Sequence, residues 1–435
     1  MIEAVIERCA GIDVGKSKLA VCLTTGPASE EPSRELRQYG TVVSELEALS
    51  EWLAENQCTH VVMESTGWYW KPVFNVLEER FTIVLANPQE VKQRKGHKTD
   101  LRDAEWLAHL LRHGMLRSSY IPPRPVRQLR DLTRRRKQLV RSGVQEKNRI
   151  QKALEEGNVE LSNVLSDMTG LSGLLMIEAL LKGTKDPEEI ARLAQGRAKS
   201  KRLEIMGAVD KHRLSETQKS LLRHSLKHLR FLEQEICELD REIEQHIAHQ
   251  GWQQKLDLLQ TLPGVDRVTA QSMLAEIGPD ASAFPSAAQL SSWAGLCPGN
   301  NVSAGVSRSC RTTKGNVWLR ATMVEAAWAA TRKKGSVLQL KYRRWSPRRG
   351  SKRALIAAAH ALIVIAHCVL TRNEPYRKTA EETATRVHRQ RSICYHIRCL
   401  TKLGFSVETK SGETNPGSKI SAKSKQRSPQ AVTTT

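Results

Sequence analysis

Roughly the first 115 residues alternate between short apolar runs and amphipathic stretches, and this alternation limits the fold more than any other feature. The segment CAGIDVGKSKLAVCLTT predicts two strands joined by a tight turn at Val14–Lys16. YGTVVS, THVVMES and FTIVLAN predict further strands, and SELEALSEWLAEN and WYWKPVFNVLEER predict helices between them. Strands that alternate with helices after an antiparallel hairpin are typical of an α/β domain.

Proline-rich and charged segments divide the rest of the chain. IPPRP at residues 121–125 ends the first pattern, so we expect an α/β domain at 1–120. A basic helical and coiled-coil region is expected at 121–250, because Leu and Ile recur every three or four residues between 222 and 247. This stripe would pair either within the chain or between chains. We expect a mainly helical domain at 251–372 and a basic, largely disordered tail at 373–435.

Four carboxylates occupy notable places in the first domain. HKTDLRDAEWLAHLL puts Asp100 and Asp103 on one face at the head of a helix, where they repel each other. Asp13 and Glu64 come at the ends of two predicted strands. Each alone suits a turn, a strand end or a solvated first helical turn. Together they are similar to the acid layout of the ribonuclease H superfamily, in which two Mg²⁺ ions about 3.5–4 Å apart clamp a scissile phosphate.

The charge is unevenly distributed. Residues 1–90 carry 7 Lys and Arg against 14 Asp and Glu, whereas the whole chain has a net charge of +22, so residues 91–435 carry +29. Nucleic acid is the usual partner of such a surplus. The helix predicted at 126–156 contains a run of four consecutive cations: Arg134, Arg135, Arg136 and Lys137. Because the charge of this run is of one sign, a phosphate-binding face is favoured over a solvated one.

Other classes of protein fit less well. Nine scattered cysteines without a CxxC pair argue against a zinc site and indicate reduced thiols in a cytosolic protein. The longest apolar run, residues 354–370, is short for a membrane span and contains His360 and His367, so a core helix is expected and no membrane partner. These histidines are interpreted as core or phosphate-facing residues. Residues 258–278 resemble a helix-hairpin-helix, with a plain helical corner as the alternative.

Two sets of motifs carry a family resemblance over roughly residues 8–335. AGIDVGKSKL, MESTGWYW, ANP and KTDLRDAEWLA resemble the RuvC-like domain of the DEDD transposases of the insertion-sequence-110 family. LPGVDRVTAQSMLAEIG and WAGLCPGNNVSAGVSRSCRTTKGNVWLRATMVEAAWAA resemble that family's C-terminal transposase domain. The resemblance implies that Asp13, Glu64, Asp100 and Asp103 are catalytic Mg²⁺ ligands.

The resemblance also implies a nucleophile. The family's C-terminal motif matches Gly295, Leu296 and Pro298, then Ser303, then Lys314 with Gly315 and Leu319 with Arg320. Ser303 therefore corresponds to the family's catalytic serine. The glycine that often follows the serine is displaced to Gly305, which leaves Ser307 and Ser309 as alternatives. Nearby cations are expected to neutralise the reacting phosphate: Arg308, Arg311, Lys314 and Arg320.

The implied function is transposition of an insertion sequence through a covalent phosphoserine. Its implied partners are donor and target DNA, a guide RNA from the element, and further copies of the chain in a dimer or tetramer. The first alternative is a RuvC-like, structure-specific endonuclease of the Holliday-junction type, which hydrolyses DNA without a covalent intermediate. The second is a non-catalytic RNA-binding protein, against which the four acids argue.

Overall fold

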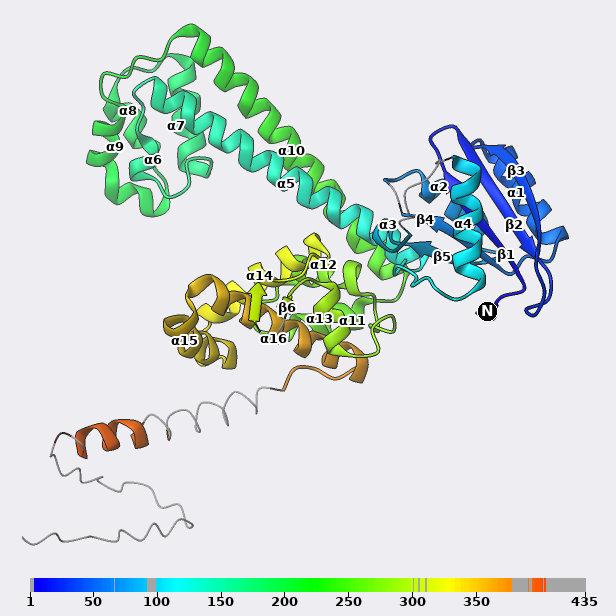
Figure 1. Cartoon of the computed structure of the whole chain (residues 1–435). Helices are drawn as coiled ribbons and strands as arrows, with labels where there is room; N and C mark the ends of the chain where they lie inside the picture. The colour runs from blue at the N-terminus through cyan, green and yellow to red at the C-terminus, as the bar shows by residue number, and fades with distance from the viewer. Residues whose placement is uncertain are drawn as a thin grey trace, which may run out of the picture.

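The N-terminal α/β domain is built on one mixed sheet (Figure 1). In the computed structural model, the strands are β1 Arg8–Val14, β2 Lys18–Thr25, β3 Ser33–Gly40, β4 His60–Glu64 and β5 Thr82–Ala86. Their order is β3-β2-β1-β4-β5, with β1, β2 and β3 antiparallel and β4 and β5 parallel to β1. The structure describes residues 4–65, 67–91, 99–299, 301–303, 306–309, 311–377, 390, 393–401 and 403.

The third strand differs from the one predicted at YGTVVS. β3 ends at Gly40, and residues from Val43 onward are already in helix. Most β3 side chains are exposed, although Tyr39 packs against Trp52 of α1. With so few buried side chains, β3 has no apolar periodicity by which the sequence could indicate it.

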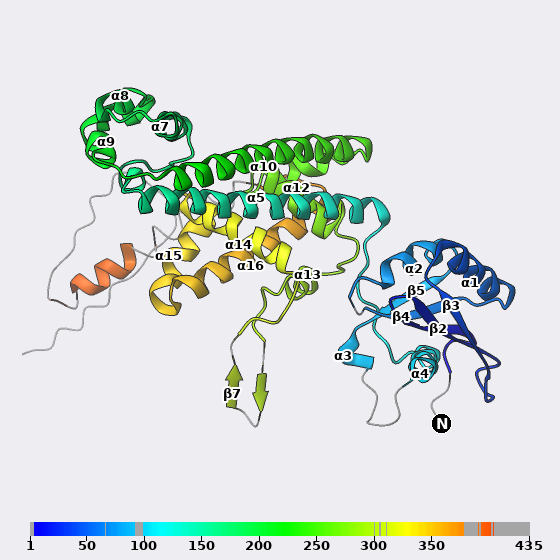
Figure 2. The same cartoon turned by 90° about the horizontal axis from the view of Figure 1, so that it is seen from above.

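Helices cover both faces of the sheet (Figure 2). On one face, α1 Val43–Glu55 and α2 Trp70–Leu77 bury Ala10, Ile12 and other residues of the same strand parity. The opposite face is covered by α4 Asp100–Arg112. The short α3 Pro88–Val91 follows β5. This layout fits a ribonuclease H-like domain.

Contacts at the middle and at the start of β1 fix the place of α4. A Cβ on Gly11 would lie 2.2 Å from the Ala104 carbonyl oxygen and 2.5 Å from the Ala108 nitrogen, so only glycine permits this close approach. At the end of α4 the buried Arg112 guanidinium donates to the carbonyls of Glu7 at 3.0 Å and Pro27 at 2.6 Å. Because Arg112 lies near the start of β1 and Ala104 near Gly11, α4 runs antiparallel to β1.

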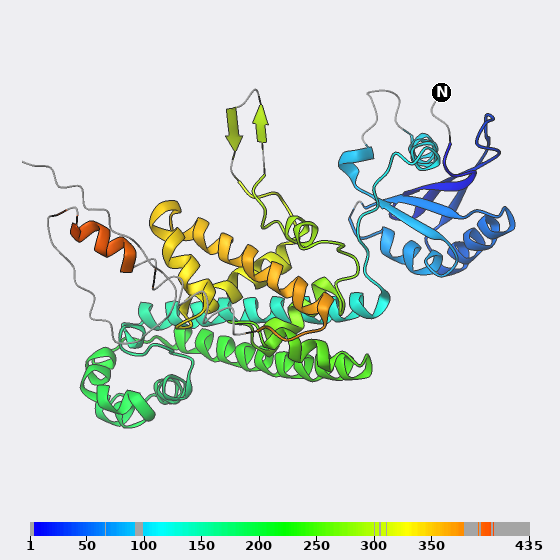
Figure 3. The same ribbon diagram turned by 90° about the horizontal axis from the view of Figure 1, so that it is seen from below.

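Two long helices form an arm (Figures 1 and 3). α5 Arg124–Glu156 and α10 Glu216–His249 lie side by side. An ion pair joins Arg136 to Asp240, and the His228 Nδ1 atom lies 3.0 Å from the Glu146 carboxylate. As residue numbers rise along α5 they fall along α10, so the pair is antiparallel. The apolar stripe of α10 therefore pairs within the chain, which resolves the choice that the sequence left open.

The far end of the arm carries a small group of helices, here called the knob. It comprises α6 Leu161–Val164, α7 Leu171–Lys182, α8 Pro187–Arg192 and α9 Arg202–Val209, with the 3₁₀ helix η1 Gly196–Lys201 between the last two. Their apolar side chains form a core with the adjoining ends of α5 and α10. The sequence indicated helix here without any motif.

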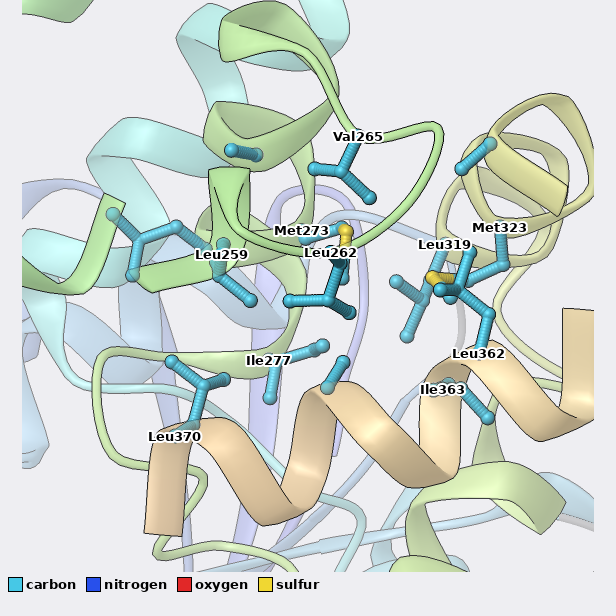
Figure 4. Packing of buried hydrophobic residues seen from close by; sticks show 14 of the residues in the cluster. Leu259, Leu262, Val265, Met273, Ile277, Leu319, Met323, Leu362, Ile363 and Leu370 are labelled. Atoms are coloured by element: carbon cyan, nitrogen blue, oxygen red, sulfur yellow. The ribbon is translucent and has the colours of Figure 1, made fainter. Parts of the chain in front are cut away.

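The C-terminal helices share a core with the base of the arm. They are α11 Gln253–Gln260, α12 Arg267–Ile277, α13 Ala287–Trp293, α14 Val317–Arg332, α15 Val337–Arg349 and α16 Ser351–Arg372. Figure 4 shows Leu362 and Leu370 of α16 on the side of Leu262, Ile277 and Leu319, and Ile363 belongs to the same buried cluster. Leu129, Ile243 and Ile247 of the arm belong to the same cluster. The arm and the C-terminal helices are therefore one folded unit.

The longest apolar helix is part of this core. By length and composition α16 could cross a membrane, and it is the one such helix in the described part of the chain. Its Ala358, Leu362, Ile363 and Ala366 are fully buried against neighbouring helices. His367 is buried as well, with its Nε2 atom 2.8 Å from the Phe284 carbonyl oxygen. The prediction of a core helix agrees with this arrangement.

The helix-hairpin-helix interpretation of residues 258–278 is not supported. A Cβ on Gly264 would lie 2.4 Å from the Ala326 carbonyl oxygen, so the turn is packed against α14 rather than open to a phosphate. The start of α12 is capped by the chain's own Asp266, whose carboxylate accepts from the Thr269 nitrogen at 2.8 Å. Hydrogen bonds from the Thr269 side chain and from this nitrogen lower the pKa of Asp266. The segment is the plain helical corner.

Candidate catalytic and nucleic-acid-binding sites

Asp13 and Glu64 lie at the carboxyl ends of neighbouring parallel strands. The last paired residues of β1 and β4 are Ile12 and Met63, and each acid comes one residue later in its strand. Ile12 and Met63 face α1 and α2. Because side chains alternate along a strand, Asp13 and Glu64 are on the α4 face of the sheet.

The first turn of α4 comes to the same edge. Since α4 runs antiparallel to β1, its N-terminal turn lies toward the carboxyl end of that strand. Asp100 and Asp103 belong to this turn, and the Thr99 hydroxyl caps it by accepting from the Arg102 nitrogen at 3.4 Å. The positive end of the helix dipole stabilises carboxylates there. The fold thus brings all four predicted acids to one edge of the sheet.

The four carboxylates share one edge of the sheet but do not form a compact cluster of metal ligands. Within the described ranges, no three Asp, Glu, His or Cys side chains come together closely enough to hold a metal ion. The set nevertheless suits a hard divalent cation, because carboxylate oxygens are the ligands that Mg²⁺ takes from proteins. Burial under α4 raises the pKa of the Cys9 thiol to about 12.

Ser303 ends the first strand of a small hairpin. β6 Asn301–Ser303 pairs with β7 Val306–Ser309, and Ser303 pairs with Val306. The base of the hairpin is held by a bridge between Pro298 and Thr312 and by the Gly299 nitrogen, which donates to the Arg311 carbonyl at 2.8 Å. The side chains of Ser303, Ser307, Arg308 and Ser309 lie outside the described part of the structure. The backbone alone places Ser303 next to the hairpin turn.

The hairpin and the acidic edge lie apart in one chain. In Figures 2 and 3 the hairpin extends away from the C-terminal helices, and α4 of the N-terminal domain is separate from it. Within one chain, Ser303 is therefore not brought to Asp13, Glu64, Asp100 and Asp103. Of the predicted cations near the serine, Arg311 and Lys314 are exposed, and Arg320 is half-buried at the start of α14.

Three of the four predicted phosphate ligands on α5 bind carboxylates of the chain. Arg134 makes two hydrogen bonds to Glu276 at 2.8 and 2.9 Å, Arg136 pairs with Asp240, and Lys137 lies 3.4 Å from Glu325. Arg135 is exposed. The one-sided charge of this segment is therefore used largely to fasten α5 to its neighbours. A role in phosphate binding remains a prediction, and it is best placed at Arg135.

Buried Glu276 was missed by sequence reasoning. Its side chain is 3% exposed and binds Arg130 at 3.1 Å, the Nε and Nη2 atoms of Arg134, and the Asn316 amide at 2.6 Å. Asn316 in turn caps α14 by accepting from the nitrogens of Trp318 and Leu319. Glu276 thus ties α5, α12 and α14 together behind the serine hairpin. No local pattern marks it, because its partners are distant in the sequence.

The paired and exposed cations of α5 should behave differently. We expect Arg135→Ala to reduce the steepness with which log affinity for duplex DNA falls with log salt by about 0.9, because the variant neutralises one fewer phosphate. The melting temperature of the protein should not change. Arg134→Ala should instead lower the melting temperature, because it leaves Glu276 partly unpaired. Fluorescence anisotropy over a salt series measures the slope. An unchanged slope for Arg135→Ala would make this residue part of a solvated face.

Two family models match the chain in the expected order. Residues 10–158 match a DEDD transposase model of the IS110 type, described as a transposase, and residues 256–343 match the model described as the transposase IS116/IS110/IS902 family. The first match contains the sheet except the first two residues of β1, and all four acids, and the second contains the hairpin with Ser303. The matched ranges leave out the knob.

Two of the relatives that the chain resembles are described as transposases, and a third as a pilin gene-inverting protein. The chain is 26% identical to a probable family 20 transposase of Pseudomonas aeruginosa, over 62% of this chain and 71% of the relative. It is 36% identical to the transposase for insertion sequence element IS1111A of Coxiella burnetii, over 27% of this chain and 34% of the relative. It is 30% identical to the pilin gene-inverting protein of Moraxella bovis, over 31% of this chain and 46% of the relative.

The solved structures that resemble part of this chain include a RuvC. The Thermus thermophilus RuvC structure aligns with 26% of this chain and 99% of its own, at 15% identity and a TM-score of 0.21.

The fold and the acids define a ribonuclease H-like domain joined to a helical frame that carries a serine hairpin. With both family models matched, the chain belongs to the IS110 family of transposases. It is a DNA transposase or recombinase, which implies that it binds DNA, and its DEDD domain indicates a divalent metal. The predicted family and enzyme class are confirmed.

Proposed function

We propose that this transposase cuts and rejoins DNA through a covalent phosphoserine formed at Ser303. The observation that carries the proposal is that Ser303 ends a hairpin strand, beyond the helical body, within the segment matched by the family's C-terminal model. Because the hairpin extends away from the C-terminal helices, its backbone can come close to a phosphodiester. Asp13, Glu64, Asp100 and Asp103 would hold Mg²⁺, which neutralises charge on the reacting phosphate.

The chemistry conserves the energy of the cut bond. The Ser303 Oγ attacks the phosphorus, the bond from phosphorus to a deoxyribose oxygen breaks, and that oxygen gains a proton as the hydroxyl loses one. The new phosphoserine ester keeps one strand attached to the protein. A hydroxyl on another strand end then attacks the ester, releases Ser303 and restores a phosphodiester, so rejoining needs no ATP.

The separation of hairpin and acids within one chain favours an oligomer. In this proposal the hairpin of one protomer completes the acidic edge of another, in a dimer or tetramer. The element's guide RNA pairs with donor and target DNA and binds the basic part of the chain, which has a net charge of +29 outside residues 1–90. A RuvC-like nuclease that hydrolyses with the acids alone is the alternative function, and it needs neither Ser303 nor the oligomer.

Ser303→Ala separates the two functions. We expect this variant to form no covalent DNA–protein adduct and to give no recombination, while DNA affinity stays within about twofold, since one hydroxyl is lost at a hairpin end. Denaturing gels of labelled element ends, followed by peptide mapping of the adduct, measure this. Ser307→Ala and Ser309→Ala are the matched controls in the same hairpin and should form the adduct.

Two results would redirect the proposal. Cleavage without any adduct in the wild type, with equal cleavage by Ser303→Ala, would establish the nuclease. An adduct that maps to Ser307 or Ser309 would keep the phosphoserine mechanism and move the nucleophile. Mixing Ser303→Ala with Asp103→Asn chains should restore activity if the site is shared between protomers, and no restoration would place both halves in one chain.

A further inference from the structure

A large basic cavity lies at the base of the serine hairpin. Its volume is about 1200 Å³, and its walls come from the hairpin base at Pro298 and Thr312 and from α14, α15 and α16. Five cations line it in addition to Arg311, and no carboxylate does in the described part of the chain: Arg320, Lys341, Arg349, Lys352 and Arg353. Like charges gathered in one cavity repel, so this arrangement favours an anionic occupant.

These five cations differ from those of α5. Arg134, Arg136 and Lys137 each pair with a carboxylate of a neighbouring helix. By contrast, the ion pairs of the described residues include none of the five cavity cations. The α5 cations are therefore explained by their ion pairs within the fold, whereas no ion pair of the fold explains the five cavity cations.

The same cavity has an apolar wall. Trp345 of α15 and Ile356 and Ala361 of α16 line it together with Leu296. Gly350 makes the corner between these two helices with φ +79° and ψ 154°, a conformation that side chains disfavour. The corner carries Arg349 on one side and Lys352 on the other, so cations surround an aromatic and aliphatic surface. An aromatic ring among cations is the arrangement that binds single-stranded nucleic acid by stacking on bases and attracting phosphates.

The position of the cavity relates it to the serine. Pro298 at its edge is five residues from Ser303, which corresponds to roughly 17 Å along an extended strand. At the rise of a stacked strand, about 3.4 Å, that length is about five nucleotides, and an extended unpaired strand covers it with fewer. A strand whose phosphate is at Ser303 can therefore reach the cavity of the same chain.

We infer that the cavity binds an unpaired stretch of a nucleic acid strand, with a base against Trp345 and phosphates on Arg320, Lys341, Arg349, Lys352 and Arg353. The volume exceeds that of ordinary small-molecule pockets and suits more than one nucleotide. A duplex does not fit this description, because its bases are stacked and paired. The inference rests on the proposed function only in that the strand continues toward Ser303; the binding itself is independent of cleavage.

The test measures binding by the full chain at equilibrium, without metal. The probes are a fluorescein-labelled oligothymidylate, an oligouridylate, an abasic strand and a duplex, all of equal length. Trp345→Ala should weaken binding of the base-bearing strands by between about five- and 150-fold, and Trp345→Phe should restore most of it because the ring is kept. Whichever of the thymidylate and uridylate strands loses more identifies DNA or RNA as the occupant.

The abasic strand and the duplex supply the decisive comparison. Both should bind Trp345→Ala and wild type equally, since one has no base to stack and the other exposes none. Equal weakening for all four probes, or no weakening for the base-bearing strands with the melting temperature unchanged, would overturn the inference. Because no strand is cut in this experiment, its outcome does not depend on whether Ser303 forms an adduct.

A separate experiment tests the cations that line the cavity. Lys352→Ala with Arg353→Ala should lower the salt slope for the abasic strand by about 0.7 for each phosphate that the variant no longer neutralises. Arg343→Ala, on the exposed face of α15 outside the cavity, should leave the slope unchanged. An equal decrease for Arg343→Ala would show that the whole surface attracts the strand and that the cavity has no special role.

Discussion

Amide substitution of any one of the four acids is expected to abolish DNA strand cleavage while the protein stays folded. Asp13 and Glu64 end neighbouring strands on the α4 face, and Asp100 and Asp103 open α4 at the same edge. Each of Asp13→Asn, Glu64→Gln, Asp100→Asn and Asp103→Asn removes a ligand from the proposed metal site and reduces repulsion between carboxylates. Cleavage of labelled element ends on denaturing gels measures the loss.

A second measurement separates metal binding from catalysis. Mg²⁺ should raise the melting temperature of the wild type by mass action and raise that of the four variants less. Glu105→Gln is the matched control, because Glu105 lies on the same helix and not among the predicted ligands. It should cut normally. Full cleavage in EDTA, or by Asp100→Asn, would contradict the metal assignment.

The largest loss of stability is expected from Glu276→Gln. This change keeps the shape of the side chain and removes its charge, so Arg130 and Arg134 remain partly buried without their shared carboxylate. Breaking a buried ion pair from one side costs about 3–5 kcal/mol. The loss should appear as faster hydrogen exchange in α12 and the start of α14, where Glu276 and Asn316 lie, since the several cores of this chain need not unfold together.

An exposed acid on the same frame gives the comparison. Glu325 also pairs with a cation of α5, Lys137, but its side chain is 69% exposed. Glu325→Gln should therefore change stability by less than about 1 kcal/mol. Equal rates of hydrogen exchange in α12 for Glu276→Gln and Glu325→Gln would show that the contact between α5, α12 and α14 does not depend on the Glu276 carboxylate.

The spacing of apolar residues along the sequence predicted those strands and helices that bury at least one face. β1, β2, β4 and β5 are apolar because helices cover them, and the long helices show their stripes for the same reason. The acids were found because each comes at the end of an apolar segment or at the head of an amphipathic helix. β3 was misplaced because an edge strand with exposed side chains has no such pattern.

Contacts between distant segments explain what the sequence could not provide. Arg134 resembles a phosphate ligand until α12 places Glu276 beside it, 142 residues along the chain. Gly264 resembles part of a phosphate-binding turn until α14 packs onto it. The cavity beside the serine hairpin has the same origin, since Arg320, Trp345 and Lys352 meet only when α14, α15 and α16 are assembled. His360 was interpreted as core or phosphate-facing, and it lines that cavity.

The paired construction of the arm limits how its length can change during evolution. α5 has 33 residues and spans about 50 Å. A deletion in α5 alone would shift Arg136 and Glu146 away from Asp240 and His228. Loss of seven residues from both helices would shorten the arm by about 10 Å and keep the same faces in contact, since seven residues make nearly two turns. The distance from knob to serine hairpin is therefore adjustable in steps of two turns, through matched changes in two segments far apart in the gene.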